Sequence, residues 1–167
     1  PKMLQLAGEI ADGVILTGAS SPKYIQEFAI KHLKTGAERG GRDLRELDVC
    51  CNIISSCDND SMQAKQLTKS MVGLCLSAPE YGSLMMRESG LDDTPLIPIR
   101  RCLAQGDTAS MQRYVTDEMV EQFTISGNFE ECRQKLREYI QAGVDTPIFW
   151  LLGNFQQTLQ KLSKILA

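Results

Sequence analysis

Apolar residues recur at helical spacing in the first eleven residues of the chain, and Pro1 is acceptable in a first helical turn. The pattern changes at Asp12 and Gly13. A short apolar run at 14–16 follows, and a loop of small polar residues comes after it. Such a run between turn residues is typical of a parallel strand that is buried on both faces. The sequence therefore predicts a helix followed by a buried strand.

The same alternation continues along the chain. A second helix begins near Pro22 and ends at Gly36 or at Gly40, and residues 49–56 (VCCNIISS) predict a second strand. Asp60 and Gln63 have the spacing of a capping box, which indicates the start of a third helix.

The last unit has the clearest pattern. Asn128 and Glu131 have capping-box spacing, an apolar helical stripe follows, and Gly143 ends it. Residues 147–152 (PIFWLL) then predict a third strand, and a closing helix follows from Phe155.

Residues 79–115 interrupt this regularity. Prolines and glycines are mixed there with short apolar pieces. An excursion of this length within a compact domain is typical of a lid, an insertion or a functional loop. We therefore expect one domain over residues 1–167 with an irregular insertion at about 79–115, followed by a short helix over 117–123.

Alternating helices and short buried strands predict an α/β fold of parallel βα units. Three strands cannot close a barrel, which takes about 250 residues. We expect the C-terminal part of a (β/α)8 TIM barrel, with about three parallel strands that are neighbours in one sheet and have their flanking helices on one side. The chain opens on Pro1 and enters a helix at once, which favours a start inside a longer protein.

Charge and apolar content argue against several classes of protein. The formal net charge is −3, and the arginines and lysines are interleaved with acids, so no basic face for nucleic acid is expected. No apolar run approaches the roughly 18 residues that span a bilayer, and no secretory signal is visible. The six cysteines form no C-x-x-C pair and His32 is the only histidine, which argues against a metal site. Structural thiols in a cytoplasmic protein are expected.

Three blocks of the sequence resemble the luciferase-like monooxygenase superfamily. The first is 1–16 (PKMLQLAGEIADGVIL), the second is the G-R-D of 41–43, and the third runs over 126–132 (SGNFEEC) and 142–145 (AGVD). The first block is especially similar to the branch that contains methylene-tetrahydromethanopterin reductase and other deazaflavin-dependent enzymes. The resemblance covers nearly the whole chain except 79–115.

This resemblance implies an oxidoreductase that uses FMN or coenzyme F420 for hydride transfer or monooxygenation of a small organic substrate. In the family, the cofactor phosphate lies against a glycine-rich loop that enters the first helix of this chain. A helix N-terminus suits a phosphate because its N–H groups are unpaired. Lys2 is therefore a candidate for cofactor binding, and the open alternative is a surface lysine in a first helical turn.

The chemistry of a barrel lies at the C-terminal ends of its strands. Thr17, Gly18 and Ser20 follow the first predicted strand, so we expect them to face the cofactor, with Thr17 and Ser20 as possible donors. The open alternative is that Ser20 or Ser21 caps the next helix. No triad, carboxylate pair or metal cluster occurs, and none is required if the cofactor carries the hydride chemistry. A homo-oligomer is expected. The alternative function is a non-catalytic half-barrel that binds a ligand or associates with itself, since open strand edges require a partner.

Overall fold

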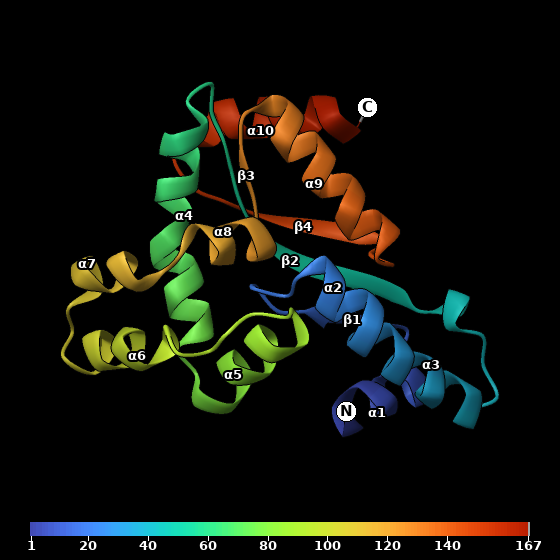
Figure 1. The fold of residues 1–167 in the computed structure, drawn as a ribbon. Coiled ribbons are helices and arrows are strands. Elements are labelled where there is room, and N and C mark those ends of the chain that lie inside the picture. The colour runs from blue at the N-terminus through green and yellow to red at the C-terminus, as the bar shows by residue number, and fades with distance from the viewer. Residues whose placement is uncertain (167) are drawn as a thin grey trace.

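The ten-residue strand β2 (Asp48–Cys57) pairs with every other strand of the sheet (Figure 1). The computed structural model describes residues 1–166, apart from the side chains at positions 155, 157, 165 and 166. Within this part of the chain, β1 (Gly13–Leu16), β3 (Thr124–Gly127) and β4 (Thr146–Leu151) all lie parallel to β2. The expectation that β1, β2 and β4 are parallel neighbours in one sheet is confirmed.

Backbone hydrogen bonds show which strand lies on which edge of β2. The carbonyls of Val49 and Ser55 accept from residues beside β4, at 2.9 and 2.8 Å. The N–H groups of Asp48 and Asp58 donate toward β1 and β3, at 3.1 and 3.0 Å. Because successive residues of a parallel strand direct their N–H and C=O groups to opposite edges, β4 takes one edge and β1 and β3 share the other.

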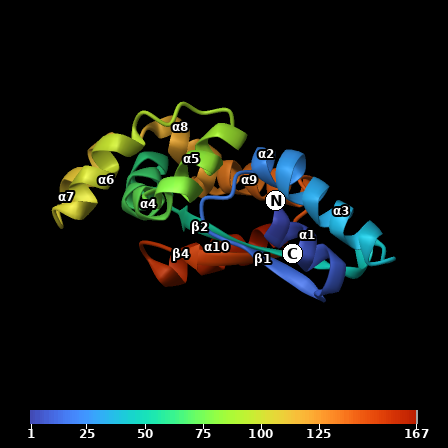
Figure 2. The same ribbon diagram turned by 90° about the horizontal axis from the view of Figure 1, so that it is seen from below.

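Helices cover the sheet. Their bounds are α1 (Lys2–Ile10), α2 (Pro22–Tyr24), a π-helical turn (Ile25–Ala29), α3 (Ile30–Arg39), a 3-10 turn (Leu44–Glu46), α4 (Ser61–Leu76), α8 (Asp117–Phe123), α9 (Phe129–Gln141) and α10 (Phe155–Leu166). Figure 2 shows α4, α8 and α9 on one side of β2 and α10 on the other, so the expectation that all helices lie on one side of the sheet is wrong for α10. None of the helices in the described part is both long and apolar enough to cross a membrane.

The expected helix starts are confirmed by their caps. The Asp60 side chain accepts from the Gln63 N–H at 3.1 Å at the start of α4. At the start of α9, the Asn128 side chain accepts from the Glu131 N–H while the Glu131 carboxylate accepts from the Asn128 N–H, which completes a capping box.

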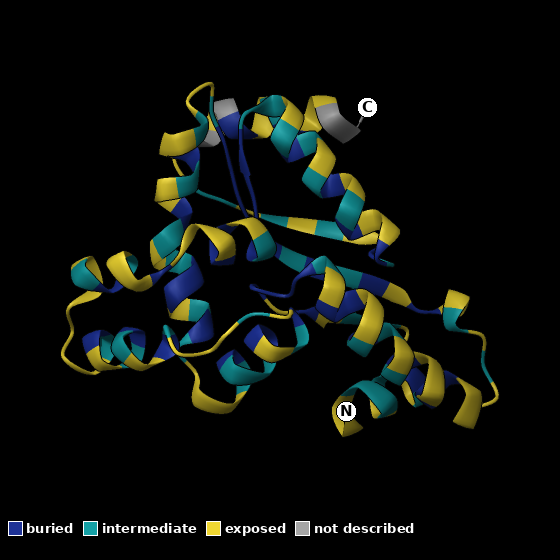
Figure 3. Ribbon diagram, viewed as in Figure 1, coloured by how far each residue is buried: buried dark blue, intermediate teal, exposed yellow. Residues whose placement is uncertain are grey.

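The core lies between the sheet and the helices on one side, and the opposite face of the sheet is open at β1 and β4. Val49, Cys51 and Ile53 of β2 are fully buried, and Figure 3 shows buried residues throughout this region. By contrast, Ile15 of β1 is 61% exposed and Trp150 of β4 is 45% exposed. An open sheet of this kind is what part of a barrel produces.

The irregular structure expected at 79–115 is not observed, and whether this segment is an insertion stays a prediction. The segment forms α5 (Pro79–Glu88), α6 (Leu96–Ala104), α7 (Thr108–Met111) and a 3-10 turn (Gln112–Tyr114). Four of its prolines and glycines mark helix ends. Pro79 is the first residue of α5 and Pro95 precedes α6, while Gly90 and Gly106 follow the ends of these helices with φ of 80° and 71°.

The strand β3 is absent from the expected elements. Its four residues TISG are all buried, but a run of two polar residues and a glycine shows neither an apolar stretch nor clear alternation. Burial between α4 and α9 makes it a strand. The assignment of 1–167 to one domain stays a prediction.

Candidate functional site

A cavity of about 370 Å³ opens at the C-terminal end of β1. Its walls come from five elements, since the lining residues are Thr17, Gly18, Asn52, Cys75, Tyr81 and Trp150. The volume lies within the roughly 300–1,000 Å³ of ligand pockets. The position also fits, because the active sites of parallel barrels lie at this end of the strands.

Hydrogen bonds hold α5 against the end of β1. The Tyr81 hydroxyl of α5 donates to the carbonyl oxygen of Gly18 at 2.8 Å and is also hydrogen-bonded to the Thr17 hydroxyl. The Ser89 hydroxyl, just after α5, lies 2.6 Å from the buried Ser21 hydroxyl. The segment expected to be an insertion therefore forms one wall of the cavity.

The absence of a side chain at Gly18 leaves space at the cavity wall. A Cβ at this position would stand 3.3 Å from the Cys75 sulfur and 3.9 Å from the Trp150 ring. The cavity wall is thus a shallow cradle between an aromatic ring and a thiol. A side chain at position 18 would reduce the space in this cradle.

The candidates Ser20 and Ser21 have structural roles in the loop. Ser20 is buried and its hydroxyl donates to the Thr17 carbonyl at 2.8 Å. Ser21 caps α2, because its side chain accepts from the Tyr24 N–H at 3.0 Å. Ala19 between Gly18 and Ser20 has φ of 64°, a left-handed conformation that costs about 1–2 kcal/mol for a residue with a Cβ. These bonds hold the loop in its tight turn.

The structure separates Lys2 from the other candidates. Thr17 and Gly18 line the cavity and Ser20 lies directly behind them, whereas Lys2 is exposed in the first turn of α1 and is not part of the lining. α1 packs on α3, on the outer layer of the molecule. A role for Lys2 in phosphate binding stays a prediction.

The titratable groups of the cavity are neutral at neutral pH. Burial raises the pKa of Tyr81, and the neighbouring Thr17 and Ser20 hydroxyls oppose that shift without cancelling it. Burial also raises the pKa of the Cys75 thiol. The lining contains no lysine, arginine or carboxylate. The cavity therefore suits an uncharged ring and does not suit a phosphate.

The cavity lining also includes Tyr81, Cys75 and Trp150, which are not among the site residues predicted from the sequence. Trp150 lies near the end of a predicted strand, which is the place where barrel site residues occur, so this position carried a usable signal. Tyr81 carried none, because only the docking of α5 on β1 brings it to the site. Asn52, in the middle of β2, lines the same cavity.

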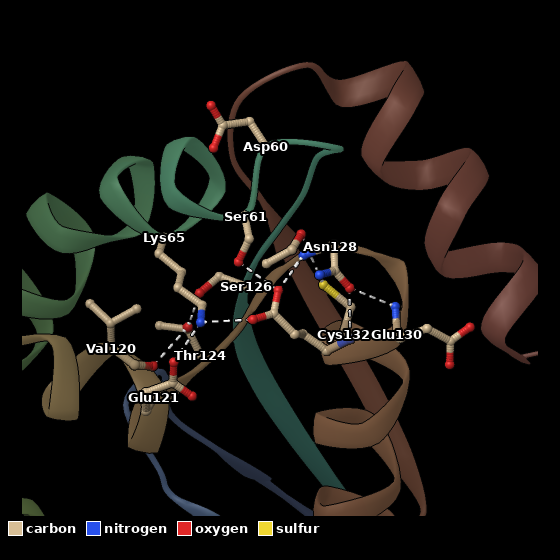
Figure 4. Close-up of polar contacts among 12 residues, drawn as sticks. Asp60, Ser61, Lys65, Val120, Glu121, Thr124, Ser126, Asn128, Glu130 and Cys132 are labelled. Carbon is tan, nitrogen blue, oxygen red and sulfur yellow. Dashed lines mark hydrogen bonds and ion pairs between the residues drawn. The ribbon is translucent and has the colours of Figure 1, made fainter.

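A charged cluster lies at the ends of β2 and β3 (Figure 4). The Glu131 carboxylate accepts from the Ser61 hydroxyl at 2.5 Å, from the Asn128 N–H at 2.7 Å and from Lys65 at 3.0 Å. Lys65 also binds Glu121 at 2.6 Å. Each charge in this cluster is paired within the chain. We therefore interpret the cluster as a structural network of ion pairs that joins α4, α8 and α9.

A larger cavity of about 550 Å³ lies at the opposite, N-terminal end of the strands, near Asp48 and Asp145. These carboxylates accept hydrogen bonds from the Thr146 hydroxyl and the Val49 N–H, both at 2.9 Å. In barrels the N-terminal ends of the strands contribute to stability and the C-terminal ends hold the active site, which makes this cavity the weaker candidate. Groups of three or more metal-ligating side chains are absent among the described residues.

Comparison with known proteins agrees with the fold. The family model "luciferase-like monooxygenase" matches residues 1–146. The chain belongs to the luciferase-like monooxygenase family. The structure of the coenzyme F420-dependent tetrahydromethanopterin reductase from Methanopyrus kandleri matches with a TM-score of 0.79 at 30% identity, over 90% of this chain and 42% of that one. The expected fold, part of a luciferase-like barrel, is confirmed.

Two relatives in this luciferase-like family illustrate the range of named activities. The chain is 35% identical to the 5,10-methylenetetrahydromethanopterin reductase of Methanolobus tindarius, over 86% of this chain and 43% of that protein. It is 30% identical to the F420-dependent glucose-6-phosphate dehydrogenase of Nakamurella multipartita, over 94% of this chain and 41% of that protein. The chain thus spans less than half the length of these relatives.

Proposed function

We propose that this protein acts as part of an oxidoreductase that binds coenzyme F420, with FMN as the alternative cofactor, and reduces or oxidises a small organic substrate. The observation that carries the proposal is the cavity between Gly18, Cys75 and Trp150 at the C-terminal end of the strands. Coenzyme F420 ranks first because several relatives at 30% identity or more are named for it or for the methanopterin reaction.

Each residue has a specific part in this proposal. A flavin or deazaflavin, when bound, supplies the hydride chemistry. Gly18 leaves space for the flat ring, Trp150 and Tyr81 exclude water from it, and Thr17 offers a hydrogen bond at its edge. Lys2 lies at a helix start with free N–H groups, which supports it as a partner of the cofactor phosphate outside the cavity.

Titration of coenzyme F420 and of FMN tests the proposal. Trp150 is the only tryptophan of the chain, so a ring in the cavity should quench its fluorescence. Thr17→Val and Lys2→Ala should each weaken binding by about 1–3 kcal/mol where the lost hydrogen bond leaves a buried or charged partner. Lys31→Ala, which removes another exposed lysine on α3, should leave binding unchanged. If neither cofactor binds at millimolar concentration, the oxidoreductase proposal is wrong.

A second candidate, a half-barrel that associates with itself, is favoured by the open face of the sheet. Ile15 is 61% exposed, Ile148 is 37% exposed and Trp150 is 45% exposed on this face. Exposed apolar rows of this kind mark interaction surfaces. Sedimentation velocity with and without Ile15→Lys is the test. A concentration-dependent dimer that the substitution abolishes supports self-association, and a monomer at every concentration excludes it.

A further inference from the structure

The hydroxyl groups at the end of β1 form a chain whose direction can be derived. Tyr81 has a single hydroxyl proton, and the carbonyl oxygen of Gly18, 2.8 Å away, can only accept. Tyr81 therefore donates its proton to Gly18. In its second hydrogen bond, with Thr17, the Tyr81 oxygen must accept, so the Thr17 hydroxyl is the donor.

The direction of this chain is stable near neutral pH. Burial raises the pKa of Tyr81, so the phenol keeps the proton that it donates to Gly18. Ser20 does not compete for the Gly18 carbonyl, because its own proton goes to the Thr17 carbonyl at 2.8 Å. The proton of Thr17 is thus committed to Tyr81, and only lone pairs of its oxygen remain for a ligand.

We infer that Tyr81 is a positioning residue that makes Thr17 a hydrogen-bond acceptor toward the cavity, so that the site selects a ring that presents an N–H or O–H group there. This inference rests on the proposed function, since it places the ligand in the same cavity. From the sequence, Thr17 is expected as a possible donor. The contact with α5 reverses that role.

The second tie between α5 and the β1 loop keeps the arrangement in place. The buried Ser21 and Ser89 hydroxyls lie 2.6 Å apart at the far end of α5. Tyr81 is thus held from both ends of its helix, and its hydroxyl needs no rearrangement when a ligand enters. Preorganisation of this kind gives a site its selectivity. Ser89 also provides a matched control, because its loss loosens α5 without removing either partner of Thr17.

The test uses lumichrome, which is the flavin ring without its side chain, and lumichrome methylated on both ring N–H groups. Both are titrated into the whole chain with Trp150 fluorescence as the signal. The unchanged protein should bind lumichrome at least tenfold more tightly than the methylated ring. In Tyr81→Phe the Thr17 proton is released and can turn toward the ligand, so this ratio should fall below threefold.

Three further variants separate the effect of the Thr17 hydroxyl from a general loss of structure at the site. Thr17→Ser keeps the hydroxyl and should keep the ratio, whereas Thr17→Val removes it and should bring the ratio below threefold. Ser89→Ala should keep the ratio even if both affinities fall together. Steric rejection of the methyl groups would be the same in all these proteins, so it cannot produce the predicted change.

The results that overturn the inference are distinct from those that overturn the proposed function. A ratio in Tyr81→Phe equal to that of the unchanged protein, or no quenching by lumichrome at all, contradicts the role of Tyr81. If coenzyme F420 or FMN still binds in that case, the proposed function stands. If the ratios follow the prediction but neither cofactor binds, the role of Tyr81 stands and the oxidoreductase proposal fails.

Discussion

Gly8 of α1 lies against the carbonyl oxygen of Leu33 in α3, where a Cβ at position 8 would stand 2.1 Å from that oxygen. Gly36 of α3 meets the Gln5 carbonyl oxygen in the same way, at 1.9 Å. The two helices therefore cross with their backbones in contact. This crossing fixes α1, and with it Lys2, relative to the rest of the molecule.

Gly8→Ala should destabilise the protein by about 1–3 kcal/mol, because backbone cannot move aside as a side chain can. Urea unfolding followed by circular dichroism measures the change. Gly73→Ala in α4 is the matched control, since its new Cβ would meet only side-chain atoms of Val115 and Met111, at 3.1 and 3.2 Å. There the gain in helix propensity, up to about 1 kcal/mol, should offset the crowding. Equal stability of Gly8→Ala and the unchanged protein would refute the crossing.

The Glu131 carboxylate should make the free energy of unfolding depend on pH in the acidic range. Burial alone would raise its pKa, but hydrogen bonds from Ser61, the Asn128 N–H and Lys65 outweigh burial and lower it. A carboxyl whose pKa is lower in the folded protein stabilises the fold above its ordinary pKa of about 4.3, and that contribution is lost as the pH falls further.

Glu131→Gln keeps an acceptor for the capping box but removes the charge, so it should cost about 0.2–1 kcal/mol at pH 7, as for other exposed ion pairs. The difference from the unchanged protein should shrink between about pH 5 and pH 3. Urea unfolding at several pH values measures this. Glu130→Gln, whose partner Arg133 is 3.6 Å away on an exposed surface, is the control. A difference that stays constant down to pH 3 would show that the charge of Glu131 is not involved.

Gly18→Ala should weaken cofactor binding by about tenfold, or about 1.4 kcal/mol, while it changes folding stability little. The added methyl would enter the cavity 3.3 Å from the Cys75 sulfur. Isothermal titration with coenzyme F420 and with FMN gives the affinity, and thermal unfolding gives the stability. Unchanged affinity with either cofactor would place that cofactor outside this cavity.

The thiols should react in an order set by their burial. Cys51, Cys57, Cys102 and Cys132 are buried, whereas Cys50 and Cys75 are partly exposed. Burial raises the pKa of Cys51 to about 12, which disfavours the reactive thiolate. Iodoacetamide should therefore label only Cys50 and Cys75 in the native protein, and all six cysteines after denaturation, as counted by mass spectrometry.

The same labelling reports on the cavity. A ligand between Gly18 and Trp150 should slow the reaction of Cys75 and leave that of Cys50 unchanged. Equal rates at Cys75 with and without bound cofactor would argue against the cavity as the binding site.

Local patterns determined most elements of the fold. The capping box of Asn128 and Glu131, the helix over 117–123 and the strands β1, β2 and β4 follow from side-chain spacing and caps, which act over a few residues. The family resemblance likewise rests on continuous blocks of sequence. The parallel direction of the strands follows because each is joined to the next by a crossover that contains helices.

Contacts between distant segments determined the rest. β3 is a strand only because burial between α4 and α9 overrides a weak local pattern. β4 takes the free edge of β2, and the docking of α5 brings Tyr81 to Thr17 across 64 positions of sequence. Sequence alone placed Thr17 and Gly18 at the end of a strand. Only the tertiary structure decided which group the Thr17 hydroxyl bonds to and which groups face it. A hydrogen bond between residues remote in sequence produces no periodic pattern in the chain.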